Sequence, residues 1–399
     1  MRKKILMALS LIALPMSLMA QLVPLLPEGS KNQLWLDPDR VYNYNLYEKS
    51  RWGVGLQYDI TLNKEKRKYL ALNAYGAYGY ADQRFKWGLK ADYQKRTARP
   101  SHTYIGFIHD LSADASRTFT QQSQAILTAP ASVMTCLFSD SYRLTAGFSR
   151  QVSKTLAETI ELRLSHESPL YWRVGTPDQW PLLYPPSYSD LKSLPYNNFL
   201  EAHLHLSHST GLQGEFSCGI VDAIKQFFLR MLVQFDRHVP IGPFDLHLFA
   251  QGGSTLGDTP YSRMFDLGGS WGCPVSLNRT LLTARPNEFT SNAFIMVNLR
   301  ITTSDPLFDL FSKPWALGTS PHPFVLCNGA WGTTWNSTSY PAPERGIGEV
   351  GAGIDGLVVW GAVYWGVGIA YRLTPASATY HFSDTKDNLT FFFTAYLDL

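Results

Sequence analysis

Residues 387–399 read DNLTFFFTAYLDL. Every second position, counted back from 399, falls in one apolar set: Leu399, Leu397, Ala395, Phe393, Phe391 and Leu389. Neighbouring side chains of a β-strand point to opposite faces, so this alternation predicts a strand. A bare aromatic strand is an aggregation hazard at the edge of a soluble sheet. It suits the closing strand of a membrane barrel, which pairs with the first strand and turns an apolar face to lipid.

The same alternation recurs along the chain, in stretches of up to about ten residues. That is the length of a tilted membrane-spanning strand, and it exceeds most globular strands. The clearest stretches are residues 52–62, 84–94, 142–149, 160–165, 226–236 and 295–301. A sheet in lipid must close, because its backbone hydrogen bonds have to be made within the protein. The sequence therefore predicts an all-β, single-chain antiparallel transmembrane β-barrel of about 14 strands, with counts of about 12–16 also fitting.

A soluble β-sandwich or propeller would also alternate. Aromatic side chains near the strand ends favour the membrane, because barrels carry aromatic girdles at both interfaces. These are Trp52, Tyr58, Tyr78, Tyr80, Trp87 and Tyr93. Charged residues make up 17% of the chain, against about 25% in ordinary soluble domains. The net charge of +3 does not indicate a nucleic-acid partner.

The N-terminus predicts export. Residues 1–20, MRKKILMALSLIALPMSLMA, have a basic start, an apolar run and small residues near the end, as in a cleaved signal peptide. A membrane anchor helix is the alternative, but the run from Ile5 to Leu14 is shorter than the roughly 20 residues that span a bilayer. We expect a signal peptide at 1–20, a short N-terminal segment at 21–50 and the barrel at 51–399. The glycine-rich, uncharged residues 356–371 are expected to form strand, turn and strand.

One stretch contains residues that could carry chemistry. In FLEAHLHLSH, residues 199–208, Glu201, His203 and His205 share one face of the expected strand. They could bind zinc or serve as acid and base. The favoured interpretation is that they line a polar lumen. Ser165 and His166 are adjacent, so they should point to opposite faces and not form a nucleophile–base pair. We expect no catalytic residues and no cofactor.

Charges of both signs fall on the expected inner face. Opposite charges across a narrow barrel would pair and fill it, which favours a plugged or narrow lumen over a wide pore. The set is Lys86, Lys90, Asp92, Arg143, Arg163, Glu201, Arg230, Asp236, Arg300 and Arg372. Four cysteines lie far apart and match no metal-binding spacing: Cys136, Cys218, Cys273 and Cys327.

Residues 168–195 interrupt the strand rhythm. The prolines there exclude a ladder strand, and a long loop of this kind is usually functional or disordered. Tyr and Trp are typical of recognition surfaces, so the candidate recognition residues are Tyr171, Trp172, Trp180, Tyr184 and Tyr188. The alternative is that the loop folds back and caps the barrel. The uncertain strand count leaves open the side of the membrane on which it lies.

Four stretches resemble one family. They are residues 69–93, YLALNAYGAYGYADQRFKWGLKADY, residues 285–300, RPNEFTSNAFIMVNLR, residues 344–358, ERGIGEVGAGIDGLV, and residues 366–373, GVGIAYRL. They look like the Bacteroidota outer-membrane barrels of unknown function that often follow a carboxypeptidase-regulatory-like domain. The resemblance runs from about Tyr47 to Leu399. That family is distantly similar to the surface-antigen, BamA-type barrel superfamily, whose assembly factors carry an Arg-Gly-aromatic motif in a lumen loop. Residues 265–282, FDLGGSWGCPVSLNRTLL, lack this motif.

The resemblance implies a place and a fold. It implies an outer-membrane location in a Gram-negative bacterium, and the C-terminal set Leu389, Phe391, Phe393, Leu397 and Leu399 resembles the signal read by the outer-membrane assembly machinery. The expected role is non-enzymatic: binding, scaffolding or envelope assembly. The expected partners are outer-membrane lipids, the assembly machinery during insertion and an envelope protein. The alternatives are a small-solute channel or transporter and, less favoured, a barrel hydrolase.

Overall fold

The computed structural model describes most of the chain between residues 23 and 397. The described residues are 23–26, 32–37, 40–45, 48–113, 138–169, 197–222, 226–269, 279–284, 289–307, 318–335, 342–360, 363–374 and 388–397. Within these ranges, no helix is long and apolar enough to cross a membrane. The signal peptide expected at residues 1–20 lies outside the described residues.

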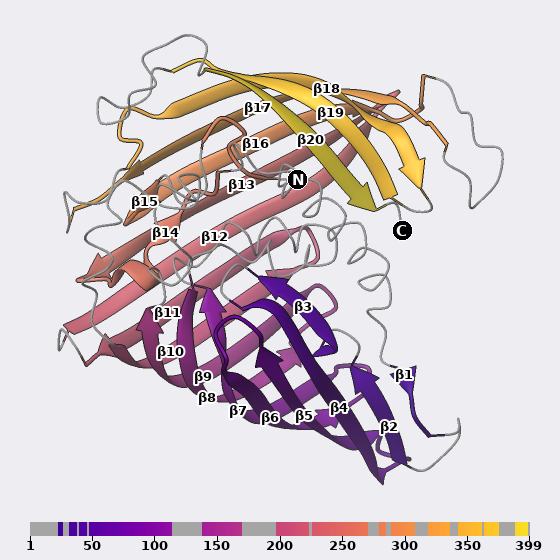
Figure 1. The fold of residues 1–399 in the computed structure, drawn as a ribbon, viewed down its shortest axis with the longest axis vertical. Coiled ribbons are helices and arrows are strands. Elements are labelled where there is room, and N and C mark those ends of the chain that lie inside the picture. The colour runs from indigo at the N-terminus through magenta and orange to yellow at the C-terminus, as the bar shows by residue number, and fades with distance from the viewer. Residues whose placement is uncertain are drawn as a thin grey trace.

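The described strands form one antiparallel sheet of 18 strands and a separate two-stranded ladder. Fifteen strands of the large sheet are long: β4 (Lys49–Asn63), β5 (Lys68–Gly79), β6 (Phe85–Lys95), β7 (Ser101–Ala113), β8 (Phe138–Gln151), β9 (Leu156–Pro169), β10 (Asn197–His208), β11 (Leu212–Val221), β12 (Gln226–Ile241), β13 (Phe244–Gly257), β16 (Ala293–Thr303), β17 (His322–Thr333), β18 (Ile347–Trp360), β19 (Val363–Arg372) and β20 (Leu389–Leu397). Figure 1 shows the sheet curling from β4 at the bottom, through β12, to β20 at the top. The predicted all-β antiparallel barrel class is confirmed. The two strands predicted within residues 356–371 are also confirmed, as the end of β18 and most of β19, and the turn between them, at residues 361–362, lies outside the described residues.

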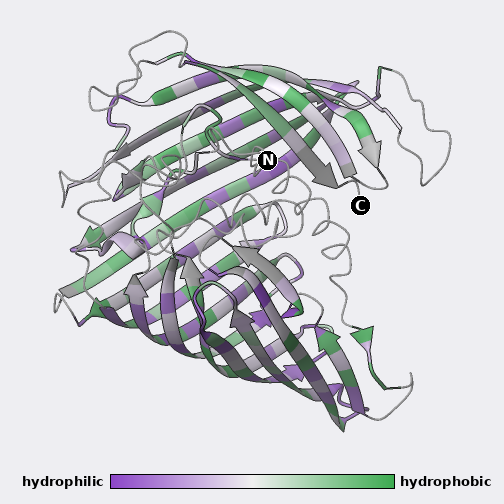
Figure 2. Ribbon diagram, in the orientation of Figure 1, coloured by the Kyte–Doolittle hydropathy of each residue, from purple (hydrophilic) through white to green (hydrophobic). Residues whose placement is uncertain are grey.

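The two faces of the sheet have opposite polarity, because side chains alternate along each strand. On β6, Leu89 is 56% exposed on the outer face, whereas Lys86 is fully buried on the inner face. The same alternation of hydrophobic and hydrophilic residues runs along most strands in Figure 2. A soluble protein buries its apolar side chains, so a sheet with an apolar outer face and charged residues inside matches a barrel in lipid.

The first strand of the barrel is interrupted. β2 (Asn32–Asp37) and β3 (Tyr42–Asn45) pair one after the other along the same edge of β4. Counted as one strand, they bring the fifteen long strands to sixteen, at the top of the predicted range of about 12–16. The sheet therefore begins before residue 51, where the sequence placed its boundary. The break between β2 and β3 falls at PDRV, residues 38–41, which interrupts the alternation that marks the other strands.

The ladder expected between the first and last strands is not among the ladders of the described residues. β20 pairs with β19, and the short β1 (Val23–Pro24) pairs with the edge of β2 that faces away from β4. A strand edge pairs with one partner at a time. β1 covers Trp35 and Leu36 of that edge, so β20 could not pair with those two residues while β1 is in place.

The strands end at two rims of the barrel. The short connections 64–67, 96–100, 152–155, 209–211 and 242–243 all lie at one rim, which we name the turn end. The connections 114–137, 170–196 and 258–292 all leave from the opposite rim, which we name the loop end. Strand parity, which the sequence left open, therefore puts Pro169 and Asn197, which flank the connection 170–196, at the loop end.

The C-terminal strand agrees with its sequence pattern where it is described. Leu389, Phe391 and Phe393 are exposed on the outer face, and Phe391 is the most exposed of them at 76%. The alternate positions Thr390, Phe392 and Thr394 are buried on the inner face. The side chain of Leu397 and residue Leu399 lie outside the described part of the chain.

Candidate functional site

Part of the chain between β13 and β16 lies on the inner face of the sheet. We name residues 258–292, described at 258–269, 279–284 and 289–292, the inner segment. It carries the short helix η3 (Tyr261–Arg263) and the ladder of β14 (Phe265–Asp266) with β15 (Thr290–Ser291). Figure 1 shows β14 and β15 within the curve of the sheet. The inner segment therefore occupies the lumen.

An apolar cluster packs the inner segment against the wall. Its members from the segment are Phe265, Leu267, Leu281, Ala284 and Phe289, and its members from the wall are Leu232, Phe249, Phe294, Met296, Ala330 and Ile347. The rings of Phe265 and Phe294 have their centroids 4.9 Å apart. The wall strands β12 to β18 thus turn apolar side chains inward, where the inner segment removes them from water.

Arg263 joins the inner segment to β9 and β10. Its guanidinium donates to Glu201 at 2.8 and 2.9 Å and to Glu167 at 2.8 and 3.1 Å, so it forms two-point contacts with both carboxylates. The guanidinium carbon also lies 4.0 Å from the centre of the Phe199 ring. All of these groups are buried. We name this set the Arg263 contact.

Arg263 keeps its positive charge although it is buried. Burial alone lowers the pKa of a guanidinium, but Glu167 and Glu201 together raise the pKa of Arg263 well above its ordinary value. Breaking such a buried ion pair by removing one partner typically costs about 3–5 kcal/mol, since the other charge stays buried without compensation. The Arg263 contact therefore fixes the position of η3 in the lumen.

Glu349 holds the inner segment on the other side. Its carboxylate on β18 accepts backbone N–H bonds from Leu282 at 2.7 Å and from Thr283 at 2.9 Å, and a bond from the Thr283 hydroxyl at 2.7 Å. Asn328 on β17 donates to the same carboxylate at 2.7 Å, and Arg372 on β19 donates to the Thr283 hydroxyl at 3.1 Å. We name this set the Glu349 contact. In Figure 1 its strands lie at the top of the barrel, whereas β9 and β10 lie near the bottom.

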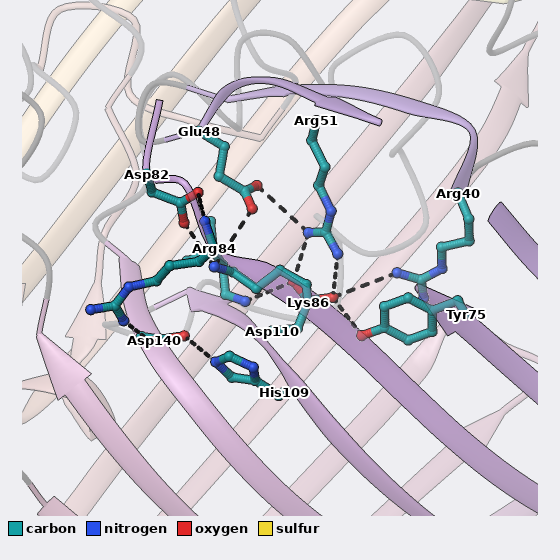
Figure 3. Close-up of polar contacts among 11 residues, drawn as sticks. Arg40, Glu48, Arg51, Tyr75, Asp82, Arg84, Lys86, His109, Asp110 and Asp140 are labelled. Carbon is teal, nitrogen blue, oxygen red and sulfur yellow. Dashed lines mark hydrogen bonds and ion pairs between the residues drawn. The ribbon is translucent and has the colours of Figure 1, made fainter. Parts of the chain in front are cut away.

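A second polar cluster lies at the loop end of β4 to β8, and Figure 3 shows it in close-up. At its centre, Asp110 accepts two bonds from Arg51, at 2.6 and 2.8 Å, and one from the Tyr75 hydroxyl at 2.6 Å. Glu48 lies 3.6 Å from Arg51 and 3.8 Å from Lys86. We name the cluster the rim network. Its charged and polar members are Arg40, Glu48, Arg51, Tyr75, Asp82, Arg84, Lys86, His109, Asp110 and Asp140.

The rim network is balanced in charge. Lys86 donates to Asp82 at 2.7 Å, Arg84 pairs with Asp140, and His109 lies 3.0 Å from Asp140. Four acidic side chains therefore meet four Arg or Lys side chains. The side chains come from β4 to β8, from the β5–β6 connection (Asp82 and Arg84), and from Arg40 and Glu48, just before β3 and β4. Its chemistry suits holding the first strands of the barrel together.

The candidate zinc or acid–base residues share the inner face, as expected. The Glu201 carboxylate accepts two hydrogen bonds from Arg263. His203 lies 3.9 Å from both Glu201 and Glu215, beyond hydrogen-bond distance, and His205 is on the same face of β10. The structure therefore brings an arginine to Glu201, which competes with any metal ion. Ser165 is buried on the inner face, whereas His166 bonds Asn198 at 2.8 Å on the other face.

Other sequence predictions have mixed outcomes. Several of the inward charges are paired: Arg230 donates to Glu215 at 2.7 Å, and Arg300 pairs with Asp355. The candidate recognition residues Tyr171, Trp172, Trp180, Tyr184 and Tyr188 lie outside the described residues. Cys218 and Cys327 are free thiols, and Cys136 and Cys273 lie outside the described ranges.

Sequence reasoning did not identify Arg263 or Glu349 as contacts. Arg263 lies in a connection without strand alternation, so no periodicity marks it. A usable signal does exist in the wall. Residues 293–297, AFIMV, are apolar at every position, which is typical of a strand covered on both faces. That run could have predicted an element packed inside the lumen.

The sequence matches no family model and no curated protein. Solved structures with a similar fold include CdiB from Acinetobacter baumannii, at 9% identity and a TM-score of 0.42, covering 87% of this chain and 57% of that one. BamA from Haemophilus ducreyi lacking POTRA domains 1–3 has 9% identity and a TM-score of 0.46, with 94% of this chain and 75% of that one covered. CdiB from Escherichia coli has 10% identity and a TM-score of 0.42, with 94% and 67% covered. This chain thus spans little more than half of the Acinetobacter baumannii CdiB chain. Similarity at this level carries no conclusion about function.

Proposed function

We propose that this chain is an outer-membrane β-barrel of a Gram-negative bacterium with a non-enzymatic role in binding, scaffolding or envelope assembly. The proposal includes export through a cleaved signal peptide at residues 1–20, insertion by the outer-membrane assembly machinery, and kinship with the Bacteroidota barrels that its motifs resemble. Its partners are outer-membrane lipids and an envelope protein.

One observation carries the proposal. The inner segment is tied to two separated parts of the wall, at the Arg263 contact on β9 and β10 and at the Glu349 contact on β17 to β19. A wide channel needs an open, water-filled lumen, whereas this lumen holds a segment of the chain on an apolar cluster. That arrangement favours a barrel whose lumen is blocked and which binds its partners at its rims and its outer surface.

The loop end faces outside the cell in this proposal, since outer-membrane barrels have short periplasmic turns and longer external loops. Residues 170–196 leave from that rim. Their tyrosines and tryptophans would offer large contact areas at low entropic cost. Tyr171, Trp172, Trp180, Tyr184 and Tyr188 are accordingly the proposed recognition residues.

Conductance separates a closed barrel from a small-solute channel. Purified protein in planar bilayers should show no sustained wide pore. The double variant Arg263→Met with Glu349→Gln removes the Arg263 contact, weakens the Glu349 contact and should raise conductance. A steady conductance in the wild-type protein that the double variant leaves unchanged would favour the channel alternative.

Affinity capture from native membranes tests the partner. Replacing residues 172–193 by a short Gly/Ser linker should leave heat-modifiable migration intact and remove the co-purifying envelope protein. A matched replacement within residues 114–137 at the same rim is the control and should retain the partner. A large loss of barrel stability, or a newly open pore, would instead show that residues 170–196 cap the barrel.

A further inference from the structure

The hairpin of β12 and β13 places two histidines side by side near the turn end. Its two-residue turn, 242–243, begins with Gly242 at φ 59°, a left-handed conformation that glycine adopts without strain. This turn sets the register in which His238 lies directly opposite His247. Asp236 lies two residues before His238 and therefore shares its inward face. Three potential metal ligands thus meet on one patch of the wall.

The donor atoms of this patch are close together. One ligand atom from each of Asp236, His238 and His247 lies within 4.8 Å of the other two. His247 Nε2 is 2.8 Å from Asp236 Oδ1, and the two imidazole rings stack with centroids 4.0 Å apart at 7°. Imidazole nitrogens and a carboxylate are ligands that Zn²⁺ and similar transition metals prefer. Binding requires the rings to splay so that both nitrogens reach about 2.0–2.1 Å from one ion. His238 is exposed and has room to turn.

Arg279 of the inner segment competes for the same carboxylate. It forms an ion pair with Oδ2 of Asp236. Its backbone is held at φ 66°, a region that residues other than glycine rarely adopt. Its Nε is buried without a hydrogen-bond partner among the described residues. Arg279 is therefore held in a costly position that it could leave for water.

We propose that Asp236, His238 and His247 form a binding site for a divalent transition-metal ion such as Zn²⁺, and that the ion competes with Arg279 for Asp236. Three protein ligands leave a fourth coordination position for water. The inner segment loses one contact with β12 when the ion binds, while the Arg263 and Glu349 contacts are untouched. The site does not depend on the proposed function, because all three of its donors belong to one hairpin, β12 and β13.

Metal titration of the full-length protein, folded in detergent with its thiols alkylated, tests the proposal. Zn²⁺ binding is measured by competition with a chromophoric chelator, and the absorption spectrum of bound Co²⁺ reports the donor set. We expect one ion per chain. His238→Ala and His247→Ala should each weaken binding by at least about tenfold, the low end of what even outer-shell partners contribute. Arg279→Met should tighten binding. Heat-modifiable migration confirms that each variant is folded.

The histidines of β10 supply the matched control. His203→Ala and His205→Ala remove two imidazoles from another inward strand face and should leave Zn²⁺ affinity unchanged. Failure to bind Zn²⁺, or binding that survives in the double variant His238→Ala with His247→Ala, would overturn the site. An unchanged affinity in Arg279→Met would overturn the competition between the ion and the inner segment.

Discussion

The two sides of the lumen are filled in different ways. Beside β4 to β8, wall side chains of opposite charge meet each other in the rim network, as between Arg51 and Asp110. Beside β12 to β18, the wall turns Phe249, Phe294 and Met296 inward, and the inner segment covers them. Charged side chains on neighbouring strands of the wall can pair with one another across a short distance. Apolar side chains have no opposite charge to meet, so a separate element is needed to remove them from water.

The lumen is therefore filled by two independent sets of contacts, ion pairs on one side and an apolar cluster on the other. Partly exposed pairs on the charged side, such as Arg84 with Asp140, contribute little each. A buried apolar cluster contributes through every contact it keeps from water. The apolar side should therefore dominate stability, and the charged side should respond to salt. Four substitutions test this comparison, from the largest expected effect to the smallest.

Phe265→Ala should have the largest effect. The ring of Phe265 is fully buried between the inner segment and the wall, so its loss should lower the free energy of unfolding by about 3–5 kcal/mol. Urea titration in lipid vesicles measures this change. Phe393→Ala, at an exposed position on the outer face, is the control and should cost much less, since lipid can fill the space. Equal costs would contradict the assignment of the apolar cluster as a core.

Leu89→Arg tests the outer face of the charged side. Leu89 lies midway along β6 and is exposed outward, so an arginine there should destabilise the barrel by about 2–4 kcal/mol in lipid. Lys90→Leu, one residue later on the inner face, should fold nearly normally, although it gives up a contact 4.4 Å from the Tyr104 ring. Folding equilibria in vesicles compare the two. A reversed order would mean that the faces are exchanged.

Asp110→Asn weakens the rim network. The amide keeps the shape of the carboxylate but loses the charge that Arg51 and Tyr75 contact. We expect a loss of about 1.5–3 kcal/mol, the range for hydrogen bonds to charged groups. Glu48, 3.6 Å from Arg51, limits the damage. Urea titration at low and high salt is the measurement. A cost above that of Phe265→Ala would reverse the ranking of the two sides.

Arg150→Ala should have the smallest effect. Arg150 pairs with Glu158 across β8 and β9 near the turn end, and its side chain is 53% exposed. Exposed pairs of this kind contribute no more than about 1 kcal/mol and are screened by salt. The change in unfolding free energy should fall toward zero as salt is raised. A larger, salt-independent change would show that exposed ion pairs of the wall stabilise the barrel more than this ranking assumes.

Much of the barrel could be predicted because its signal is local. The alternation in residues 84–94 identified β6, and the C-terminal alternation identified the outward positions of Leu389, Phe391 and Phe393. The number of strands was harder to predict from the sequence. The broken first strand, β2 with β3, lacks a continuous pattern, so it was assigned to an N-terminal segment before residue 51. The inner segment could not be placed, since nothing in its own sequence says which wall it contacts.

By itself, the sequence determined the class of the fold and the polarity of its faces. Both follow from a period of two residues, which each strand carries without reference to any other strand. Only the tertiary structure decided that Arg263 meets Glu167 and Glu201, that Glu349 holds Leu282 and Thr283, and that Arg279 reaches Asp236. These pairs join residues that are distant along the chain, and curling the sheet is what brings them together. Contacts of this kind depend on register and closure, which no local pattern contains.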